Sequence, residues 1–434
     1  MNFKIMIKKC IKISNDFGFK TMVKKILRSI KCRVMTTFNR SSFRYRRIYN
    51  QYYNELKDIM DCEKYHSIIV FDSRVGWNIP LFQRPQHMAR ELSNKGFLYL
   101  YRTSEQFDCH IKGIKKLKDR LYLVNMSNYI LQNVLFDLLK NSNKKRFLSL
   151  YSTDIFLDEK YITDKYISNG FNIVYEYIDE LSSEISGELP NFIYERHKNI
   201  LIDKNNFILV TADKLMDEVR SIRGAHKVAM VSNGVDYEHW QNKNRVVPEK
   251  IKDIVDKGNI IVGYFGALAK WVDYKLIKKI AEERPNYEIV LIGFLYDNEF
   301  KKSGVENIKN VHYLGVIDYK ELPLYAKYFN ISMIPFLLNS ITESTNPVKL
   351  FEYMALNNPI VTTDLRECRK YKSVLIGRNH KEFVEKLDYA LNINKNDKYY
   401  TYLREEALEN TWTKKAEIFY KLIDKNIKIE VDFR

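Results

Sequence analysis

Cysteine is sparse in this 434-residue sequence, and its spacing argues against two kinds of site. The five cysteines form no Cys-x-x-Cys pair; they are Cys10, Cys32, Cys62, Cys109 and Cys368. Neither a zinc site nor a disulfide framework is therefore expected, and the composition fits a reducing cytoplasm. Long apolar runs are absent too, because no stretch reaches the roughly 18 residues that a membrane-spanning helix needs.

What is present indicates a globular protein of two domains. Hydrophobic residues make up 45% of the chain and aromatic residues 14%, which is typical of packed domains. The chain is too long for one ordinary core, so two domains of roughly 170 to 200 residues each are expected.

Positive charge is concentrated at the amino terminus. Residues 1–48 contain 14 Lys or Arg and a single acid, which is +13 of the total charge of +17. Apolar residues fall on one helical face of residues 3–13 and again of residues 22–30, with basic residues opposite. Such helices bind the surface of anionic membranes. Packing on the protein body, nucleic-acid binding and a targeting presequence are the alternatives; a secretory signal is not expected.

Short β-branched runs alternate with helical patterns in the second half of the chain. The runs cover residues 260–265, 288–292, 331–335 and 359–363, and one of the amphipathic stretches between them is 273–283. This alternation predicts a parallel sheet with crossover helices. Ligands of such sheets bind at the carboxyl ends of the strands.

The sequence from Asn346 to Glu352 predicts a helix start that binds phosphate. Asn346 is expected to cap the helix and Pro347 to occupy its first position. The amides of Val348 and Lys349 would then point out of the positive end of the helix dipole. Glu352 lies about one turn further along, where its carboxylate can accept hydrogen bonds from two hydroxyl groups, as on a ribose.

A second segment, Gly266 to Asp273, follows a predicted strand and precedes a predicted helix. Gly266 permits close backbone approach, and Lys270 offers a positive charge to a diphosphate. Together with Ala267, these residues are expected to face the phosphate-binding helix across a cleft.

These motifs resemble the carboxyl-terminal domain of retaining glycosyltransferases with the GT-B fold, in particular those that build bacterial capsule, O-antigen and teichuronic acid. The resemblance runs from about His66 to about Tyr420. Members of that group carry two glutamates separated by seven residues, the first binding the donor sugar and the second the ribose. Glu352 matches the second glutamate. Ser344 stands at the first position, with Glu343 one residue earlier.

The resemblance implies an α/β protein with two Rossmann-like domains that face each other across a cleft. We expect the basic amphipathic helical arm at 1–60, an acceptor domain at 61–240 and a linker at 241–258. The nucleotide-sugar domain is expected at 259–400, followed at 401–434 by a helix that crosses back to the first domain.

Candidate residues of the first domain follow its predicted strands. Gln83 and Arg84 open a helix and are expected to bind the acceptor or a phosphate. His87, in the same first turn, is either a hydrogen-bond donor in the cleft or a structural residue. Asp179 belongs to an acidic cluster after the strand at 173–177; it either orients the acceptor hydroxyl as a general base or caps the next helix.

The expected activity is transfer of a sugar from a nucleoside-diphosphate sugar to a hydroxyl of a lipid-linked or growing cell-surface glycan. Lys270, Asp179 and His87 are the candidate catalytic residues. No Asp-x-Asp string of the metal-dependent kind occurs, so neither a metal nor a cofactor is expected. The alternatives are a nucleotide-sugar 2-epimerase and a non-catalytic sugar-nucleotide-binding scaffold; nucleic-acid binding ranks third. The expected location is the inner face of the cell membrane.

Overall fold

The computed structural model describes residues 43–80, 82–181, 189–241, 246–393 and 397–424. The basic helices predicted within residues 1–42 lie outside these ranges. The described chain divides into a small unit, residues 43–63 and 125–142, and a large unit, residues 64–124 and 143–424. In the described ranges, no helix is both long enough and apolar enough to cross a bilayer.

The small unit is a pair of helices, α3 (Phe43–Cys62) and α5 (Tyr129–Lys140). Tyrosines spaced four residues apart on α3 form a stripe that faces α5. The Tyr49 hydroxyl donates to Asp137 at 2.7 Å, and Tyr52 accepts a hydrogen bond from Asn128 at 3.1 Å. The contact therefore combines hydrogen bonds with ring contacts, and Leu56 is the fully buried residue of α3.

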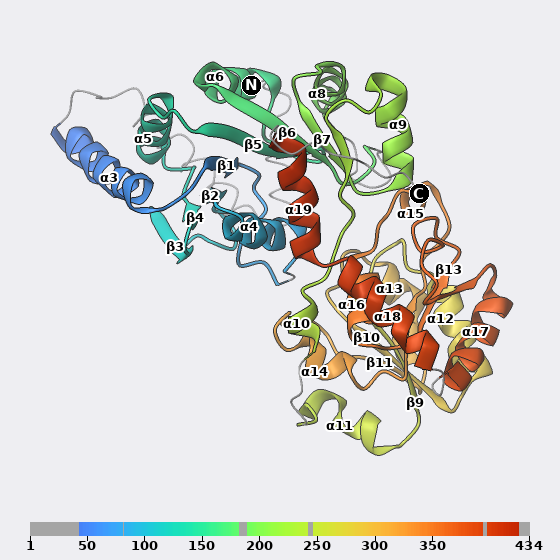
Figure 1. Cartoon of the computed structure of the whole chain (residues 1–434). Helices are drawn as coiled ribbons and strands as arrows, with labels where there is room; N and C mark the ends of the chain where they lie inside the picture. Colours follow the sequence, from blue (N-terminus) through green and yellow to red (C-terminus); the bar gives the residue numbers. More distant parts are fainter. Residues whose placement is uncertain (1–42, 81, 182–188, 242–245, 394–396, 425–434) are drawn as a thin grey trace. The chain divides into compact units, whose positions relative to one another are not determined.

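The large unit contains two lobes, each built on its own sheet (Figure 1). The first sheet has the order β3-β4-β2-β1-β5-β6-β7-β8 and is parallel except for the β3–β4 pair. Most of its strands are buried on both faces, which explains their continuous apolar runs. The strands are β1 (Ser67–Phe71), β2 (Phe97–Arg102), β3 (Ile114–Lys118), β4 (Leu121–Val124), β5 (Lys145–Tyr151), β6 (Phe171–Tyr177), β7 (Phe207–Val210) and β8 (Val228–Met230). The helices of this lobe are α4 (Arg84–Asn94), α6 (Glu159–Lys165), η1 (Ile167–Asn169), α8 (Asn191–Ile202) and α9 (Asp213–Arg223).

The second sheet has six parallel strands in the order β11-β10-β9-β12-β13-β14. This is the strand order of the Rossmann fold, and the order reverses between β9 and β12, where such sheets bind ligands. The strands are β9 (Ile260–Phe265), β10 (Tyr287–Ile292), β11 (Val311–Tyr313), β12 (Ile331–Ile334), β13 (Ile360–Thr363) and β14 (Val374–Gly377). The helices are α10 (Tyr237–Trp240), α11 (Glu249–Asp256), α12 (Tyr274–Glu283), α13 (Glu299–Ser303), η2 (Val305–Asn307), α14 (Leu322–Ala326), α15 (Ser340–Glu343), α16 (Val348–Ala355) and α17 (His380–Ile393).

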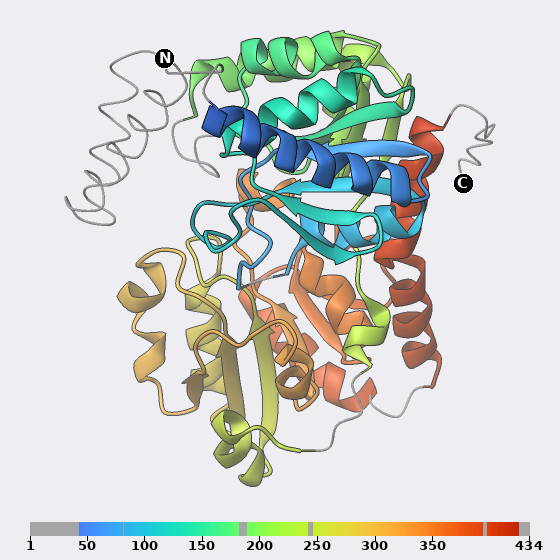
Figure 2. The ribbon, with the colours of Figure 1, turned by 90° about the vertical axis from the view of Figure 1, so that its left-hand side faces the viewer.

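Two final helices join the lobes. α18 (Asp397–Glu409) buries Leu403 and Ala407 in the core of the second lobe. α19 (Trp412–Ile423) buries Trp412 and Phe419 in the core of the first lobe. Figures 1 and 2 show α19, in red, against the first lobe. The chain therefore returns to the first lobe between residues 409 and 412.

The predicted linker at 241–258 contains structure of its own. Its second half forms α11, and Ile251 and Ile254 of that helix belong to the core of the second lobe. Pro248 precedes the helix, where its missing amide costs no hydrogen bond. Trp240 of α10 belongs to the same core, so the second lobe includes residues before the predicted boundary at 259.

Candidate functional site

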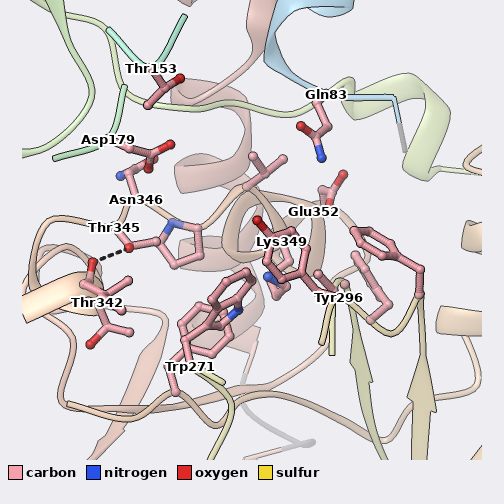
Figure 3. Close-up of a pocket in the computed structure, with 18 of the residues that line it drawn as sticks. Gln83, Thr153, Asp179, Trp271, Tyr296, Thr342, Thr345, Asn346, Lys349 and Glu352 are labelled. Carbon is pink, nitrogen blue, oxygen red and sulfur yellow. Dashed lines mark hydrogen bonds between the residues drawn. The ribbon is translucent and has the colours of Figure 1, made fainter. Parts of the chain in front are cut away.

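A pocket of about 650 Å³ opens at the carboxyl ends of both sheets, at the strand-order reversal of the second one. Figure 3 shows Lys349 and Glu352 in its centre, with Gln83 and Asp179 reaching in from the first lobe. Both aromatic rings and polar groups line it. The lining residues are Phe82, Gln83, Thr153, Ile155, Asp179, Leu189, Phe265, Gly266, Ala267, Trp271, Phe294, Tyr296, Tyr319, Leu322, Phe336, Ile341, Thr342, Thr345, Asn346, Pro347, Val348, Lys349 and Glu352.

The amino-terminal end of α16 forms one wall of this pocket. The helix begins at Val348, one residue later than predicted, and Pro347 rather than Asn346 is its cap residue. The Asn346 side chain does not cap the helix, because it is hydrogen-bonded to Asn233 and Glu367 instead. The amides of Val348 and Lys349 still open the helix, so neither has a carbonyl partner within it. This end favours negatively charged ligands.

Lys349 brings its ammonium group to the same wall. Its side chain extends past Gly266, whose φ is +139°, and a β-carbon built there would lie 2.7 Å from Lys349 Cε. The absence of a side chain at residue 266 therefore makes room for the lysine. The ammonium lies 4.8 Å from the ring centroid of Phe336 and 5.3 Å from that of Tyr264. Burial lowers the pKa of Lys349 to about 8, although the nearby Glu352 opposes the shift.

Glu352 lies one turn after Lys349 on the same face of α16. It is 6% exposed, and burial raises its pKa to about 8 against the opposing effect of Lys349. Its carboxyl group faces the pocket beside the lysine (Figure 3). A cation, free helix amides and a carboxyl group thus share one helix end, and together they can bind a ligand that carries both phosphate and hydroxyl groups.

Lys270 does not take the position predicted for it. It is exposed and does not line the pocket, whereas Ala267, Gly266 and Trp271 of the same segment do. The reason is the turn after β9: the Lys270 amide donates to Asp297 at 2.8 Å, and Leu268 pairs with Leu295. These bonds tie the segment to the loop after β10. The cation of the pocket is Lys349, which the sequence had suggested only as an amide donor.

Neither candidate for the first acidic position supplies a carboxylate to this pocket. Ser344 is 1% exposed, and its hydroxyl donates to the Ile341 carbonyl at 3.4 Å. Glu343 is exposed, lies 3.6 Å from Lys214 and lines a separate cavity. The hydroxyls of Thr342 and Thr345 occupy this part of the pocket wall instead.

On the first-lobe side, two of the predicted residues line the pocket, Gln83 and Asp179. Asp179 follows β6, and burial raises the pKa of its carboxyl group to about 6, although Arg84 opposes the shift. The backbone carbonyl of Asp179 accepts a hydrogen bond from Ser152 at 3.4 Å. A carboxylate held at this place can accept a hydrogen bond from a hydroxyl group in the pocket.

Arg84 and His87 are structural residues rather than pocket residues. Arg84 is 4% exposed; it pairs with Glu176 at 2.9 Å and donates to the Val231 carbonyl at 2.9 Å. His87 is 2% exposed, and its ring stacks on Trp412 of α19 at 5.0 Å. Its bonds direct Arg84 to β6 and to the end of β8, and stacking on Trp412 directs His87 to α19, so the predicted roles at the cleft are corrected for both.

The sequence reasoning missed the aromatic wall of the pocket. Trp271 and Tyr296 lie on neighbouring loops with ring centroids 5.2 Å apart, and Tyr319 and Phe82 stack at 5.7 Å. Trp271 lies within the segment from Gly266 to Asp273 but carried no prediction of its own. The sequence did contain a signal that the Lys349 side chain enters the pocket. Residues three apart on a helix share a face, and Glu352 was already assigned to the site. Within the described residues, no three His, Cys, Asp or Glu side chains form a group that could hold a metal ion.

Comparison with known proteins finds a family match within the second lobe. Residues 259–392 match the family described as "Glycosyl transferases group 1". TuaH of Bacillus subtilis (strain 168), described as a candidate teichuronic acid biosynthesis glycosyltransferase, is 25% identical over 255 residues. That alignment covers 55% of this chain and 64% of TuaH, so the chain spans less than two thirds of this relative.

Solved structures share the fold over most of the chain. Sucrose-phosphate synthase from Thermosynechococcus elongatus superposes with a TM-score of 0.61 at 12% identity, covering 82% of this chain and 98% of that one. Anabaena Alr3699/HepE, solved with UDP-glucose, gives 0.61 at 11% identity, with 82% and 99% covered. WaaG, a glycosyltransferase involved in lipopolysaccharide biosynthesis, gives 0.55 at 12% identity, with 82% and 100% covered. At these identities the likeness shows the fold, and the predicted GT-B architecture and the resemblance to glycosyltransferases are confirmed.

Proposed function

From the match of residues 259–392 to the glycosyl transferases group 1, we propose that this protein transfers a sugar from a nucleoside-diphosphate sugar to a hydroxyl group of a cell-surface glycan. The similarity to TuaH supports a cell-surface polymer as the product. The observation that carries the proposal is the end of α16, where free amides, the Lys349 ammonium and the Glu352 carboxyl group meet in one pocket.

In this proposal α16 binds the donor at two points. The amides of Val348 and Lys349 and the Lys349 ammonium hold the diphosphate, and Glu352 accepts hydrogen bonds from the ribose hydroxyls. Support comes from the spacing, because the two side chains are one turn apart on one helix face, and the diphosphate and ribose of a nucleoside diphosphate are adjacent groups.

The proposed chemistry is the departure of a nucleoside diphosphate. Negative charge grows on the leaving phosphate as the glycosidic bond breaks, and a fixed positive potential stabilises that charge without rearrangement of water. Lys349 and the helix amides supply this potential in the proposal. We therefore propose a reaction without a bound metal, and, from the resemblance alone, retention of the anomeric configuration with no protein nucleophile assigned.

The acceptor is proposed to approach from the first lobe. Gln83, Thr153 and Asp179 line that side, and Asp179 is the carboxylate among them. Above pH 6 the Asp179 carboxyl group is mostly ionised and can accept a hydrogen bond from the hydroxyl group of the acceptor. This bond would orient the hydroxyl oxygen toward the donor.

Attachment to an anionic membrane surface is the remaining part of the proposal. It rests on the charge of residues 1–48 and on the exposed start of α3, where Phe43 is 85% exposed beside the exposed Arg44, Arg46 and Arg47. Basic residues near an anionic leaflet contribute about 1 kcal/mol each. A lipid-linked acceptor would then be met at the membrane surface.

The decisive experiment has two stages. Purified protein is first screened for binding of UDP, GDP, ADP and dTDP by a thermal-shift assay; a ligand at 100 times its Kd stabilises by about 2.7 kcal/mol. The matching nucleotide sugars are then tested for nucleoside-diphosphate release with and without a lipid-linked glycan. Release that depends on the acceptor supports the transferase. Interconversion of the free nucleotide sugar would point to an epimerase, and binding without turnover on any acceptor would point to a scaffold.

A further inference from the structure

The donor-binding end of α16 is held in place from the first lobe. Asn346, two residues before α16 and 5% exposed, accepts a hydrogen bond from the Asn233 amide at 2.9 Å through its side-chain oxygen. The Asn233 side chain donates to the Asn346 carbonyl at 2.7 Å. Asn233 follows β8 of the first lobe, so both bonds join the two lobes directly at the wall of the pocket.

A buried carboxylate completes this contact from the other side. Glu367 lies four residues after β13 and is 1% exposed. It accepts a hydrogen bond from the Asn346 side chain at 3.3 Å and one from the Asp213 amide at 2.8 Å. Asp213 is the first residue of α9 in the first lobe. Lys370 joins the two carboxylates, since its ammonium lies 2.8 Å from Glu367 and 2.7 Å from Asp213.

The charge and burial of Glu367 distinguish it from its neighbours in the seam between the lobes. Arg366 also crosses the seam, to Asp217 at 2.8 Å, but both of those side chains are exposed and neither is bonded to Asn346. An exposed ion pair contributes little, whereas hydrogen bonds to a buried carboxylate are strong and directional. Together with Asn233, Glu367 can therefore fix the position of Asn346, whereas Arg366 cannot.

We propose that Glu367 and Asn346 are positioning residues that set the amides of Val348 and Lys349 for the donor diphosphate only while the two lobes are in contact. The inference rests on the proposed function of the pocket. Because Asn346 is held by Asn233 and, through Glu367, by Asp213, the donor site of the second lobe is completed by the first. Donor binding and contact between the lobes then favour each other, as linkage requires.

The test uses Glu367→Gln in the full chain, with Arg366→Gln as the matched control. Affinity for the nucleoside diphosphate that wild type binds best is measured by calorimetry. We expect Glu367→Gln to bind about tenfold more weakly, the size of one charge-assisted hydrogen bond, and Arg366→Gln to bind within about twofold of wild type. In turnover assays Glu367→Gln should raise the donor KM and leave the acceptor KM unchanged, which a general loss of stability would not do.

A second variant covers the case in which Glu367→Gln does not fold. Asn233→Ser removes the side-chain bond to the Asn346 carbonyl and keeps the backbone bond, so it should weaken nucleoside-diphosphate binding in the same direction. Wild-type affinity in both variants, or an equal loss in Arg366→Gln, overturns the positioning role. Absence of any nucleoside-diphosphate binding by wild type would instead contradict the proposed function, so the two failures are distinguishable.

Discussion

Lys349 and Glu352 are one turn apart on α16 and both face the pocket, yet no ion pair joins them in the described structure. Burial disfavours the charged form of each, with pKa values of about 8 for both groups. A buried acid and base that are not paired with each other are free to bind a ligand of mixed character. Perturbed groups of this kind are typical of functional sites.

Replacing Lys349 by alanine should weaken binding of the nucleoside diphosphate. A hydrogen bond to a charged group contributes about 1.5 to 3 kcal/mol, so calorimetry should show a loss of roughly 10- to 150-fold. Lys270→Ala is the matched control, because Lys270 is exposed and outside the pocket. If instead the Lys270 variant is impaired and the Lys349 variant binds normally, Lys270 holds the diphosphate, as predicted from the sequence.

Affinity for the nucleoside diphosphate should fall as the pH rises through about 8. Below that pH, Lys349 already carries its proton, so binding the anion requires no proton uptake. Above it, binding must add a proton, and affinity drops by up to about tenfold per pH unit. The terminal phosphate titrates near pH 6, so the ligand charge is constant over this range.

Lys349→Arg is the control for this pH dependence, measured by calorimetry between pH 7 and 9.5. A guanidinium stays charged throughout, so the profile should flatten. Any change of affinity with pH that remains in this variant is assigned to Glu352, which loses its proton over the same range. An unchanged slope would show that Lys349 is not the titrating group.

Asp179→Asn should lower turnover without weakening nucleoside-diphosphate binding. If Asp179 orients the acceptor hydroxyl, kcat should fall by about 100-fold or more, the usual contribution of a positioned acid or base. The wild-type rate should also fall as the pH drops below about 6, because Asp179 then takes up a proton. A variant with full turnover and an unchanged pH profile would leave Asp179 with no part in the reaction.

Arg84→Ala should destabilise the first lobe rather than impair ligand binding. The substitution leaves Glu176 buried without its cation, which typically costs about 3 to 5 kcal/mol. Urea unfolding followed by tryptophan fluorescence measures the effect. Arg90→Ala removes an exposed ion pair with Asp236 from the same helix and should change stability by less than about 1 kcal/mol. Normal stability with lost acceptor binding would restore the role at the cleft predicted from the sequence.

Residues 1–48 should bind anionic vesicles in a salt-sensitive manner. The full chain is expected to sediment with vesicles containing phosphatidylglycerol and much less with purely phosphatidylcholine vesicles, since the attraction is electrostatic. Replacing Arg44, Arg46 and Arg47 together by glutamine should shift the binding curve to higher lipid concentration. Equal binding to both vesicle types, or tighter binding to duplex DNA, would contradict the membrane role.

The sequence by itself determined the strands at whose carboxyl ends the pocket lies and the helix that carries Glu352. Alternating β-branched runs and amphipathic stretches are short-range patterns, so they predicted β9, β10, β12 and β13 and the start of α16 close to their observed bounds. The edge strand β3 was not predicted. Its sequence, Ile-Lys-Lys-Leu-Lys, has no apolar run, and none of its residues is fully buried.

Tertiary structure alone decided which side chains enter the pocket. The turn after β9 directs Lys270 outward through its bond to Asp297, and the missing side chain at Gly266 admits Lys349 in its place. Arg84 and His87 lie at the start of α4 as predicted, but Arg84 is buried by its bonds to Glu176 and the Val231 carbonyl, and His87 is buried against Trp412. Sequence spacing fixes neighbours along one helix or strand, whereas side-chain direction depends on contacts between segments far apart in the chain.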